Sequence, residues 1–143
     1  MSLDLILQLH RATHRVGLFL AAWEPSLDVN QAEAHILAFL AQAGPSPIGA
    51  VHRAFAHKRS TLTGVLDRLE AKGWLSREAH PDDRRSTLLR LTPKGVKQAA
   101  RVKEAMTALG NALAEEMSPH ALAATARCLE ALEHAAERAG GGD

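Results

Sequence analysis

Hydrophobic residues follow helical spacing along most of the chain and strand-like patterns in only two short runs. Residues 3–23 carry apolar side chains over more than half of a helix circumference, with no proline before Pro25. A helix at the edge of a domain needs a narrower stripe, so this breadth indicates a second partner surface. The apolar positions are Leu5, Leu9, Ala12, Val16, Phe19 and Leu20.

A second helix is predicted to begin after Asn30. Asn30 and Glu33 have the spacing of a capping box, and an apolar stripe continues from there to an end near Gly44. The Pro-Ser-Pro sequence that follows breaks the chain. Residues 48–55 then form a short helix, which we interpret as the first helix of a helix-turn-helix.

A helix with one polar face is predicted from Lys58 to Lys72. Its inward positions are Leu62, Val65, Leu66 and Leu69. Its opening turns carry basic and hydroxyl side chains, namely Lys58, Arg59, Ser60, Thr61 and Thr63. We expect Ser60 or a neighbour to cap the first amides and Gly73 to end the helix. Such a helix can enter the DNA major groove, about 12 Å wide, and donate to bases and phosphates.

Two short β-prone runs follow, residues 74–79 and 86–92. The turn between them, residues 80–85, is rich in proline, aspartate and arginine, and the pattern predicts a hairpin with Arg84 and Arg85 at its tip. An arginine-tipped hairpin suits the minor groove, whose narrow forms concentrate negative potential. The helix and the hairpin together predict a winged helix-turn-helix.

The rest of the chain is predicted to be helical. Pro93 begins a long helix that runs to Met117, and residues 119–139 form a last helix before a glycine-rich tail that we expect to fray. The fold class is therefore mainly α with a small β-hairpin wing. With 143 residues and 46% hydrophobic content, the chain has room for a single domain, 1–143, with a real core.

Four segments resemble the MarR family of transcriptional regulators in order and spacing. They are Ser60–Thr63, Leu66–Gly73, Pro81–Arg85 and Leu91–Gly95. The resemblance implies a DNA-binding lobe over about residues 45–92 and dimerisation helices at 1–24 and 93–139. It further implies a homodimer that binds a palindromic operator in double-stranded DNA, with half-sites about one helical turn apart.

The resemblance also implies roles for residues of the wing. Asp83 and Arg85 match the family's Asp-x-Arg pattern, in which the arginine enters the minor groove and the carboxylate orients the wing. The alternative is an exposed turn whose charges are only solvated. Arg68 and Arg84 complete the residues that we expect to contact DNA.

Two features of the helix-turn-helix concern its packing. Asp67 and Glu70 are expected to pair with Arg68 or Lys72, or with the wing. His52 and His57 stand where the family usually has a small alanine and an aliphatic residue. The local packing that sets the tilt of the recognition helix therefore departs from the common family pattern.

Charge is distributed unevenly along the chain. Between His52 and Gly95, ten Lys and Arg residues stand against five Asp and Glu, a net charge of +5, which leaves −4 for the rest because the whole chain carries +1. Affinity for a polyanion is therefore expected to be local. No run approaches 18 apolar residues and no signal segment opens the chain, so we expect a cytoplasmic protein without a membrane partner.

Three histidines suggest an effector site. His10 and His14 are four residues apart on one helical face, a spacing that also allows two imidazoles on one metal. In zinc-sensing relatives a histidine lies where His35 lies, but Ala34 replaces their adjacent glutamate, so we expect no metal and no cofactor. We expect these histidines to border a cleft that binds a small aromatic acid or phenol, which releases a repressor from DNA.

The sequence also bears on other classes of function. Cys128 offers a thiol-redox switch, but its place among apolar residues of the last helix predicts a buried, inert thiol. No glycine-rich phosphate loop, HExxH pattern or nucleophile elbow is present, so the chain is not expected to be an enzyme. A helical interaction module without DNA affinity, and a constitutive DNA binder without an effector, remain alternatives.

Overall fold

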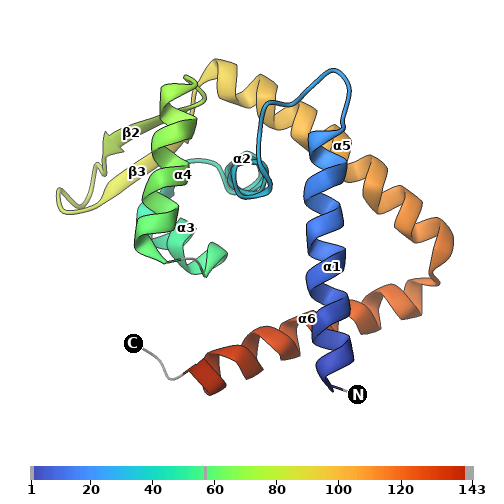
Figure 1. Cartoon of the computed structure of the whole chain (residues 1–143). Coiled ribbons are helices and arrows are strands. Elements are labelled where there is room, and N and C mark those ends of the chain that lie inside the picture. The colour runs from blue at the N-terminus through green and yellow to red at the C-terminus, as the bar shows by residue number, and fades with distance from the viewer. Residues whose placement is uncertain (1, 57, 141–143) are drawn as a thin grey trace. The chain divides into compact units, whose positions relative to one another are not determined.

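Six helices and three short strands make up the part of the chain that the computed structural model describes, residues 2–56 and 58–140 (Figure 1). In chain order they are α1 (Ser2–Ala21), α2 (Gln31–Ala43), β1 (Ser46–Pro47), α3 (Ile48–Phe55), α4 (Arg59–Ala71), β2 (Leu75–Ala79), β3 (Thr87–Leu91), α5 (Pro93–Glu116) and α6 (Pro119–Gly140). The predicted fold class is confirmed. His57 and the end of the predicted tail, residues 141–143, lie outside the described residues.

Helix α2 begins at the predicted capping box. The Asn30 Oδ1 accepts a hydrogen bond from the Glu33 N–H at 2.8 Å, and the Glu33 Oε2 accepts from the Asn30 N–H at 3.4 Å. Two amides that the helix itself cannot satisfy are thereby paired. The helix ends before Gly44, whose φ of 73° favours glycine.

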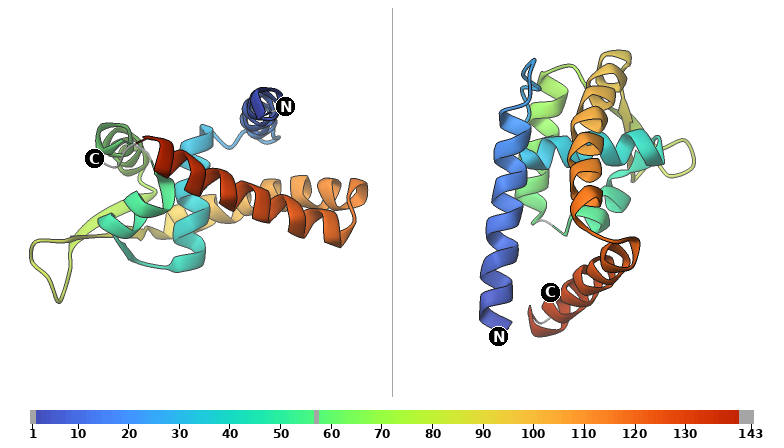
Figure 2. Two further views of the ribbon diagram at one scale, coloured as in Figure 1. Left: turned by 90° about the horizontal axis from the view of Figure 1, so that it is seen from below. Right: turned by 90° about the vertical axis from the view of Figure 1, so that its right-hand side faces the viewer.

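The sheet has one strand more than the predicted hairpin. Its order is β1-β3-β2, all antiparallel, and Ser46 of β1 pairs with Leu89 of β3. The prediction missed β1 because it is two residues long and contains Pro47, which lacks the N–H of a regular ladder and is tolerated only at a sheet edge. The hairpin of β2 and β3 extends away from α3 and α4 in both views of Figure 2.

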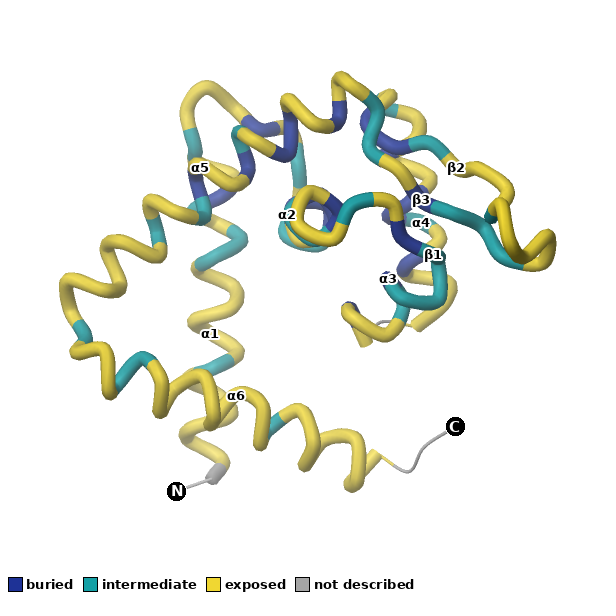
Figure 3. The backbone as a smooth tube through the Cα atoms, turned by 180° about the vertical axis from the view of Figure 1, so that it is seen from behind, coloured by how far each residue is buried: buried dark blue, intermediate teal, exposed yellow. Residues whose placement is uncertain are grey.

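The core lies where α2, α3, α4, the sheet and the first half of α5 meet (Figure 3). Its largest fully buried side chains are Leu20, Leu27, Ile36, Leu37, Leu66, Leu69, Leu89, Val51 and Val102. They come from α1, α2, α3, α4, β3, α5 and the α1–α2 loop. Packing of this kind fixes the backbone of α4, whose opposite side is exposed.

The junction between the sheet and α5 is a backbone contact. A Cβ atom on Gly95 would lie 1.9 Å from the carbonyl oxygen of Trp74, so only glycine fits there. The Thr92 hydroxyl accepts from the Gly95 N–H at 2.9 Å and donates to the Gly73 carbonyl at 2.6 Å. The threonine and the glycine of the Leu91–Gly95 segment thus tie the start of α5 to the end of α4.

The chain divides into two compact units, one up to Met106 and one from Thr107. Helix α6, in the second unit, has no buried residue. Cys128 is exposed, so the prediction of a buried thiol is wrong. The sequence pattern placed Cys128 among apolar neighbours correctly, but that face of α6 is not covered within the one chain.

Candidate nucleic-acid interface

Helix α4 has one buried face and one exposed face. Its apolar positions Leu62, Val65, Leu66 and Leu69 are at most 3% exposed. The predicted contact residues, which we call the reading face, are all exposed: Lys58, Arg59, Ser60, Thr61 and Thr63. This is the arrangement that the sequence pattern predicted, because burial at i, i+3, i+4 and i+7 turns the remaining positions outward.

The cap at the start of α4 differs from the prediction. The N-cap residue is Lys58, whose side chain makes no capping hydrogen bond, and among the described residues no cap from Ser60 or a neighbour is found, so that expectation is wrong. Ser60 is the second residue inside the helix, where its hydroxyl no longer precedes the free amides. The Thr63 hydroxyl instead donates to the Arg59 carbonyl at 2.8 Å. The free amides leave partial positive charge at this end of α4.

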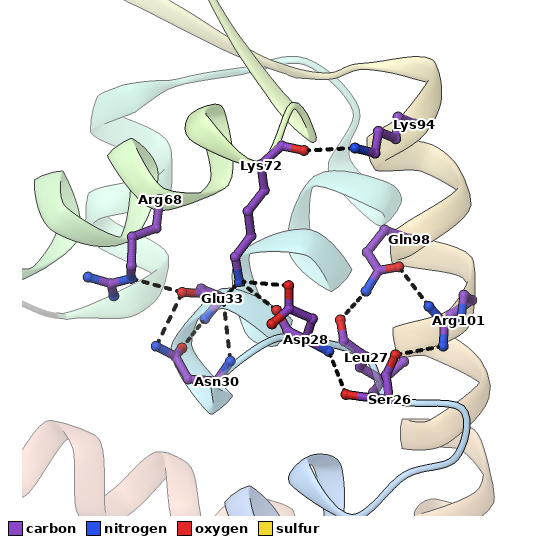
Figure 4. A network of polar contacts seen from close by, with 10 residues as sticks. All are labelled: Ser26, Leu27, Asp28, Asn30, Glu33, Arg68, Lys72, Lys94, Gln98 and Arg101. Atoms are coloured by element: carbon purple, nitrogen blue, oxygen red, sulfur yellow. Dashed lines mark hydrogen bonds and ion pairs between the residues drawn. The ribbon is translucent and has the colours of Figure 1, made fainter.

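The second half of α4 is anchored to α2 through a buried carboxylate (Figure 4). The side chain of Glu33 is 3% exposed and accepts from Arg68 Nε at 2.8 Å and from Lys72 Nζ at 3.0 Å. Burial tends to raise the pKa of Glu33, but the hydrogen bonds from Arg68 and Lys72 and the charge of Lys72 outweigh it and lower that pKa. We call Glu33, Arg68 and Lys72 the anchor network. Arg68, expected to contact DNA, is thus held on one side by Glu33, while its side chain stays 51% exposed.

The anchor network continues into the loop before α2 and into α5 (Figure 4). Lys72 Nζ donates to the Asp28 carbonyl, and Lys94 Nζ donates to the Lys72 carbonyl at 3.2 Å. Gln98 donates to the Leu27 carbonyl, and Arg101 donates to the loop carbonyls of Pro25 and Ser26. The end of α4 is therefore fixed to three neighbouring parts of the chain.

The wing is joined to α4 by an ion-pair cluster. Arg77 of β2 contacts Asp67 at 2.6 Å and Glu70 at 3.1 Å. Both carboxylates pair with the wing, one of the two partners that the sequence analysis kept open. These acids are neutralised locally, which lowers their repulsion of an approaching phosphate backbone.

The tip of the wing is ordered by its own backbone. The Asp83 side chain accepts from the Arg85 N–H at 3.0 Å, and the Asp83 carbonyl accepts from the Ser86 N–H at 3.0 Å. This is the turn chemistry for which aspartate is favoured. Arg84 and Arg85 are exposed and project from this turn.

The arginines around the interface fall into two groups. Those that form ion pairs or hydrogen bonds with their guanidinium groups are Arg68, Arg77, Arg90 and Arg101. Among the described residues, no such partner is found for Arg53, Arg59, Arg84 and Arg85. The second group supplies guanidinium groups that can bind an anion.

One cationic hollow was missed by the sequence analysis. A cavity of about 420 Å³ lies between α3 and α4, and we call it the α3–α4 hollow. Its lining residues are Ile48, Gly49, His52, Arg53, Arg59, Leu62 and Thr63. Arg53 entered the charge count but had no signal of its own, because the packing of α3 against α4, and not the spacing within one helix, brings it to the same hollow as Arg59.

The three histidines are divided between two places. His10 and His14 line a hollow of about 390 Å³ with Arg11, Arg15 and Leu18, which we call the α1 hollow. His35 lies on α2, with its ring centroid 4.1 Å from that of Phe55. Among residues 2–56 and 58–140, no three His, Cys, Asp or Glu side chains are grouped so that they could hold a metal ion. Within the same residues, no helix is long and apolar enough to span a membrane.

Comparisons with known proteins agree with this fold. The family model of the MarR family matches residues 29–87. The multiple antibiotic resistance protein MarR of Salmonella typhimurium is 33% identical over 69 residues, 48% of each chain. The HTH-type transcriptional regulator MhqR of Bacillus subtilis is 30% identical over 95 residues, 66% of each chain. The match to the Salmonella protein thus spans about half the length of that relative.

Solved structures give the same result over more of the chain. A probable transcriptional regulator from Pseudomonas aeruginosa has a TM-score of 0.75 at 25% identity, covering 88% of this chain and 94% of that one. PcaV of Streptomyces coelicolor, in complex with its natural ligand, has a TM-score of 0.79 at 22% identity, covering 91% and 92%. Reduced AbfR bound to DNA has a TM-score of 0.75 at 21% identity, covering 95% and 94%. The chain belongs to the MarR family, whose members named here are transcriptional regulators and not enzymes.

Proposed function

We propose that this protein is a sequence-specific DNA-binding regulator that represses transcription as a homodimer in the cytoplasm. The observation that carries the proposal is the exposed reading face on α4, whose basic and hydroxyl groups stand beside a wing tipped by Arg84 and Arg85. The reading face would enter the major groove, and the arginines of the wing the minor groove. Reduced AbfR, a protein with the same fold, has been solved bound to DNA.

The homodimer is supported by apolar side chains that one chain leaves uncovered. On α1, the second half of α5 and α6 these are Leu3, Leu5, Ile6, Leu7, Leu18, Leu113 and Leu129, each more than 40% exposed. A second copy that covered the terminal helices would remove this surface from water. Two-fold symmetry would then present two reading faces to a palindromic operator.

We also propose a small effector that weakens DNA binding. The α1 hollow supports it, because His10, His14, Arg11 and Arg15 together favour an anionic ligand such as an aromatic acid. PcaV, of the same fold, is in complex with its natural ligand. A phenolic effector, zinc sensing, thiol sensing and constitutive DNA binding are the competing proposals.

Selection of bound duplexes from a random pool tests the DNA-binding proposal. We expect a palindrome with half-sites about one helical turn, roughly 10 base pairs, apart. Binding to that site should weaken steeply with salt, with a log–log slope of about −0.9 for each phosphate neutralised. Recovery of no sequence, or a slope near zero, would reject the proposal in favour of an interaction module without DNA affinity.

The effector proposal is tested by titrating operator binding with aromatic acids and phenols, with zinc and a chelator as parallel arms. We expect acids to weaken binding, and the double variant His10→Ala/His14→Ala to weaken that response more than it weakens DNA affinity. The variant His35→Ala tests whether α2 contributes to the response to the effector. A response to zinc alone would replace the proposal by metal sensing, and no response in any arm would support constitutive binding.

A further inference from the structure

The hydroxyl group of Thr63 is bonded back to its own helix. Its Oγ1 donates to the carbonyl oxygen of Arg59, one helical turn earlier, at 2.8 Å. A carbonyl oxygen can only accept, so the single proton of the hydroxyl group is committed to this bond. Toward its other surroundings the hydroxyl group therefore offers lone pairs and no donor. The bond also fixes the rotamer of Thr63, since χ1 of a helical threonine depends on whether Oγ1 makes such a bond.

The position of Thr63 distinguishes it from two other threonines with the same bond. Thr13 on α1 and Thr125 on α6 donate to the carbonyl groups of Leu9 and Ala121 in the same way. Helical threonines often form this bond, so the bond alone implies no function. Of these three, Thr63 belongs to the reading face, where a hydroxyl group that cannot donate has a restricted choice of partners.

The charged groups of α4 do not duplicate this acceptor. The basic side chains at the start of the helix can only donate hydrogen bonds. The carboxylates of Asp67 and Glu70 can accept, but they contact Arg77 of the wing at 2.6 and 3.1 Å. Thr63 thus adds a neutral acceptor to a helix start whose charged groups are donors.

Duplex DNA has few groups that could donate to such an acceptor. The phosphate and sugar oxygens of its backbone only accept, so a hydroxyl group without a free proton gains no hydrogen bond from them. The donors in the major groove are the amino groups of adenine (N6) and cytosine (N4), whereas guanine and thymine present acceptors there. A hydroxyl group that only accepts is therefore complementary to adenine or cytosine.

The methyl group of Thr63 distinguishes between these two bases. Because Oγ1 faces the Arg59 carbonyl, the methyl group takes another staggered position on Cβ, and the side chain as a whole is exposed. An A·T pair presents the thymine C5-methyl group in the same groove as the adenine amino group, and a threonine methyl group packs well against it. A G·C pair presents no methyl group. The hydroxyl and methyl groups together favour an A·T pair.

We propose that Thr63 selects an A·T base pair in each half-site of the operator, with Oγ1 accepting from the adenine amino group and the methyl group packing against the thymine methyl group. Thr63 is then a specificity-determining residue, and this role rests on the proposed function. One opposing interpretation is that Thr63 contacts only water. Another is that Thr61 makes the base contact, since it is exposed and its hydroxyl group has no hydrogen-bond partner among the described residues.

The experiment removes single groups from the DNA and from the protein together. In the selected operator each adenine of a half-site is replaced in turn by purine, which lacks the amino group. Each thymine is replaced by uracil, which lacks the methyl group, and the same change is made in both half-sites. The Kd of each duplex is measured for the wild type, for Thr63→Val, which lacks the hydroxyl group, and for Thr63→Ser, which lacks the methyl group. Each pair of changes forms a double-mutant cycle that isolates one contact.

We expect purine at one position to weaken the binding of the wild type and of Thr63→Ser by about fivefold for each half-site, and that of Thr63→Val by less than about twofold. Uracil at the same base pair should weaken the binding of the wild type and of Thr63→Val by about threefold for each half-site, and that of Thr63→Ser by less than about 1.5-fold. Purine and uracil thus identify the hydroxyl contact and the methyl contact separately.

The matched control is Thr125→Val, which removes the same kind of bond from α6 and should respond to both base changes as the wild type does. Circular dichroism and thermal unfolding verify that each variant folds. A purine response in Thr63→Val equal to that of the wild type would overturn the proposal, as would loss of that response in Thr61→Val instead. A uracil response that Thr63→Ser retains in full would overturn the role of the methyl group. If the protein binds no duplex, the proposed function fails as well; if it binds its operator but no adenine gives a response to purine, only the contact of Thr63 fails.

Discussion

The two halves of α5 lie in different surroundings. From Gly95 to Ala105 the helix buries five residues, and three of them, Ala99, Val102 and Ala105, belong to the core that holds α4. Beyond Ala105, no described residue of α5 or α6 is buried (Figure 3). The first half is completed by its own chain, whereas the second half has a face that one chain does not cover. Sequence periodicity is the same in both, so periodicity identifies a buried face without identifying what buries it.

The largest effect is expected where the first half of α5 meets the sheet. Gly95→Ala places a Cβ on the Trp74 carbonyl, and because neither partner is a flexible side chain, we expect a loss of about 3 kcal/mol or more in unfolding free energy. The matched control is Gly110→Ala in the second half, where nothing lies within 4 Å of the added atom. That variant should gain up to about 1 kcal/mol from helix propensity. Chemical denaturation measures both, and equal effects would contradict the close backbone contact.

The next effect concerns the uncovered faces. Leu5→Glu on α1 and Leu129→Glu on α6 should each raise the dissociation constant of the proposed dimer by about 10- to 100-fold, because a Leu lost from an interface costs roughly 1.5–3 kcal/mol. Val96→Glu is the control, since Val96 is 57% exposed but lies in the first half of α5. Sedimentation equilibrium over a dilution series measures all three. An unchanged constant in both test variants would place the dimer contact elsewhere.

A smaller effect is expected from the anchor network, and it depends on pH. Glu33→Gln should lower the unfolding free energy by about 1–2 kcal/mol at pH 7, since a buried carboxylate loses its charge beside Arg68 and Lys72. The pKa of Glu33 is lowered in the folded protein, so its contribution is present above the ordinary value of 4.5 and is lost as the pH falls through the lower folded pKa.

The difference between wild type and Glu33→Gln should therefore shrink as the pH falls below 4.5. Glu78→Gln is the matched control, because Glu78 pairs with Arg90 at the surface and should change stability by less than about 0.5 kcal/mol. Denaturation at a series of pH values measures both. A difference that stays constant with pH would contradict the assignment of the effect to the carboxylate.

The smallest effect is expected at the wing tip, where the exposed Arg85 side chain does not support the fold. Arg85→Ala should lower operator affinity by about tenfold and reduce the salt slope by about one, while the melting temperature stays the same. Lys103→Ala removes an exposed positive charge from α5 and should leave operator affinity within about twofold. Anisotropy titrations at matched salt measure both, and equal losses would mean that net charge alone drives binding.

Local patterns in the sequence predicted most of the fold. The capping box at Asn30 and Glu33, the apolar face of α4 and the glycine stop at Gly73 each depend on residues within one or two helical turns. Their positions were therefore predictable from spacing alone. The strand β1 could not be predicted, because two residues, one of them Pro47, carry no pattern.

The contacts of the candidate interface were less predictable, because they join distant segments. Nothing in the spacing of Glu33 and Lys72, on α2 and at the end of α4, indicates that they meet. The α3–α4 hollow likewise depends on the angle between two helices, which sequence periodicity does not contain. The exposure of Cys128 could not be predicted either, since an apolar helix face is uncovered or covered according to what packs on it.

The contact of Gly95 with the Trp74 carbonyl has a mechanical consequence. This joint brings two backbone segments into direct contact, and no side-chain rotamer can absorb a change of angle between them. The start of β2 and the start of α5 are therefore expected to move together. Within the first compact unit α5 continues from Gly95 to Met106, about 12 residues or about 18 Å at 1.5 Å per residue. A rotation of about 5° at the joint would move the Met106 end of this segment by roughly 1.5 Å. The missing side chain of Gly95 thus fixes the direction in which α5 leaves the sheet.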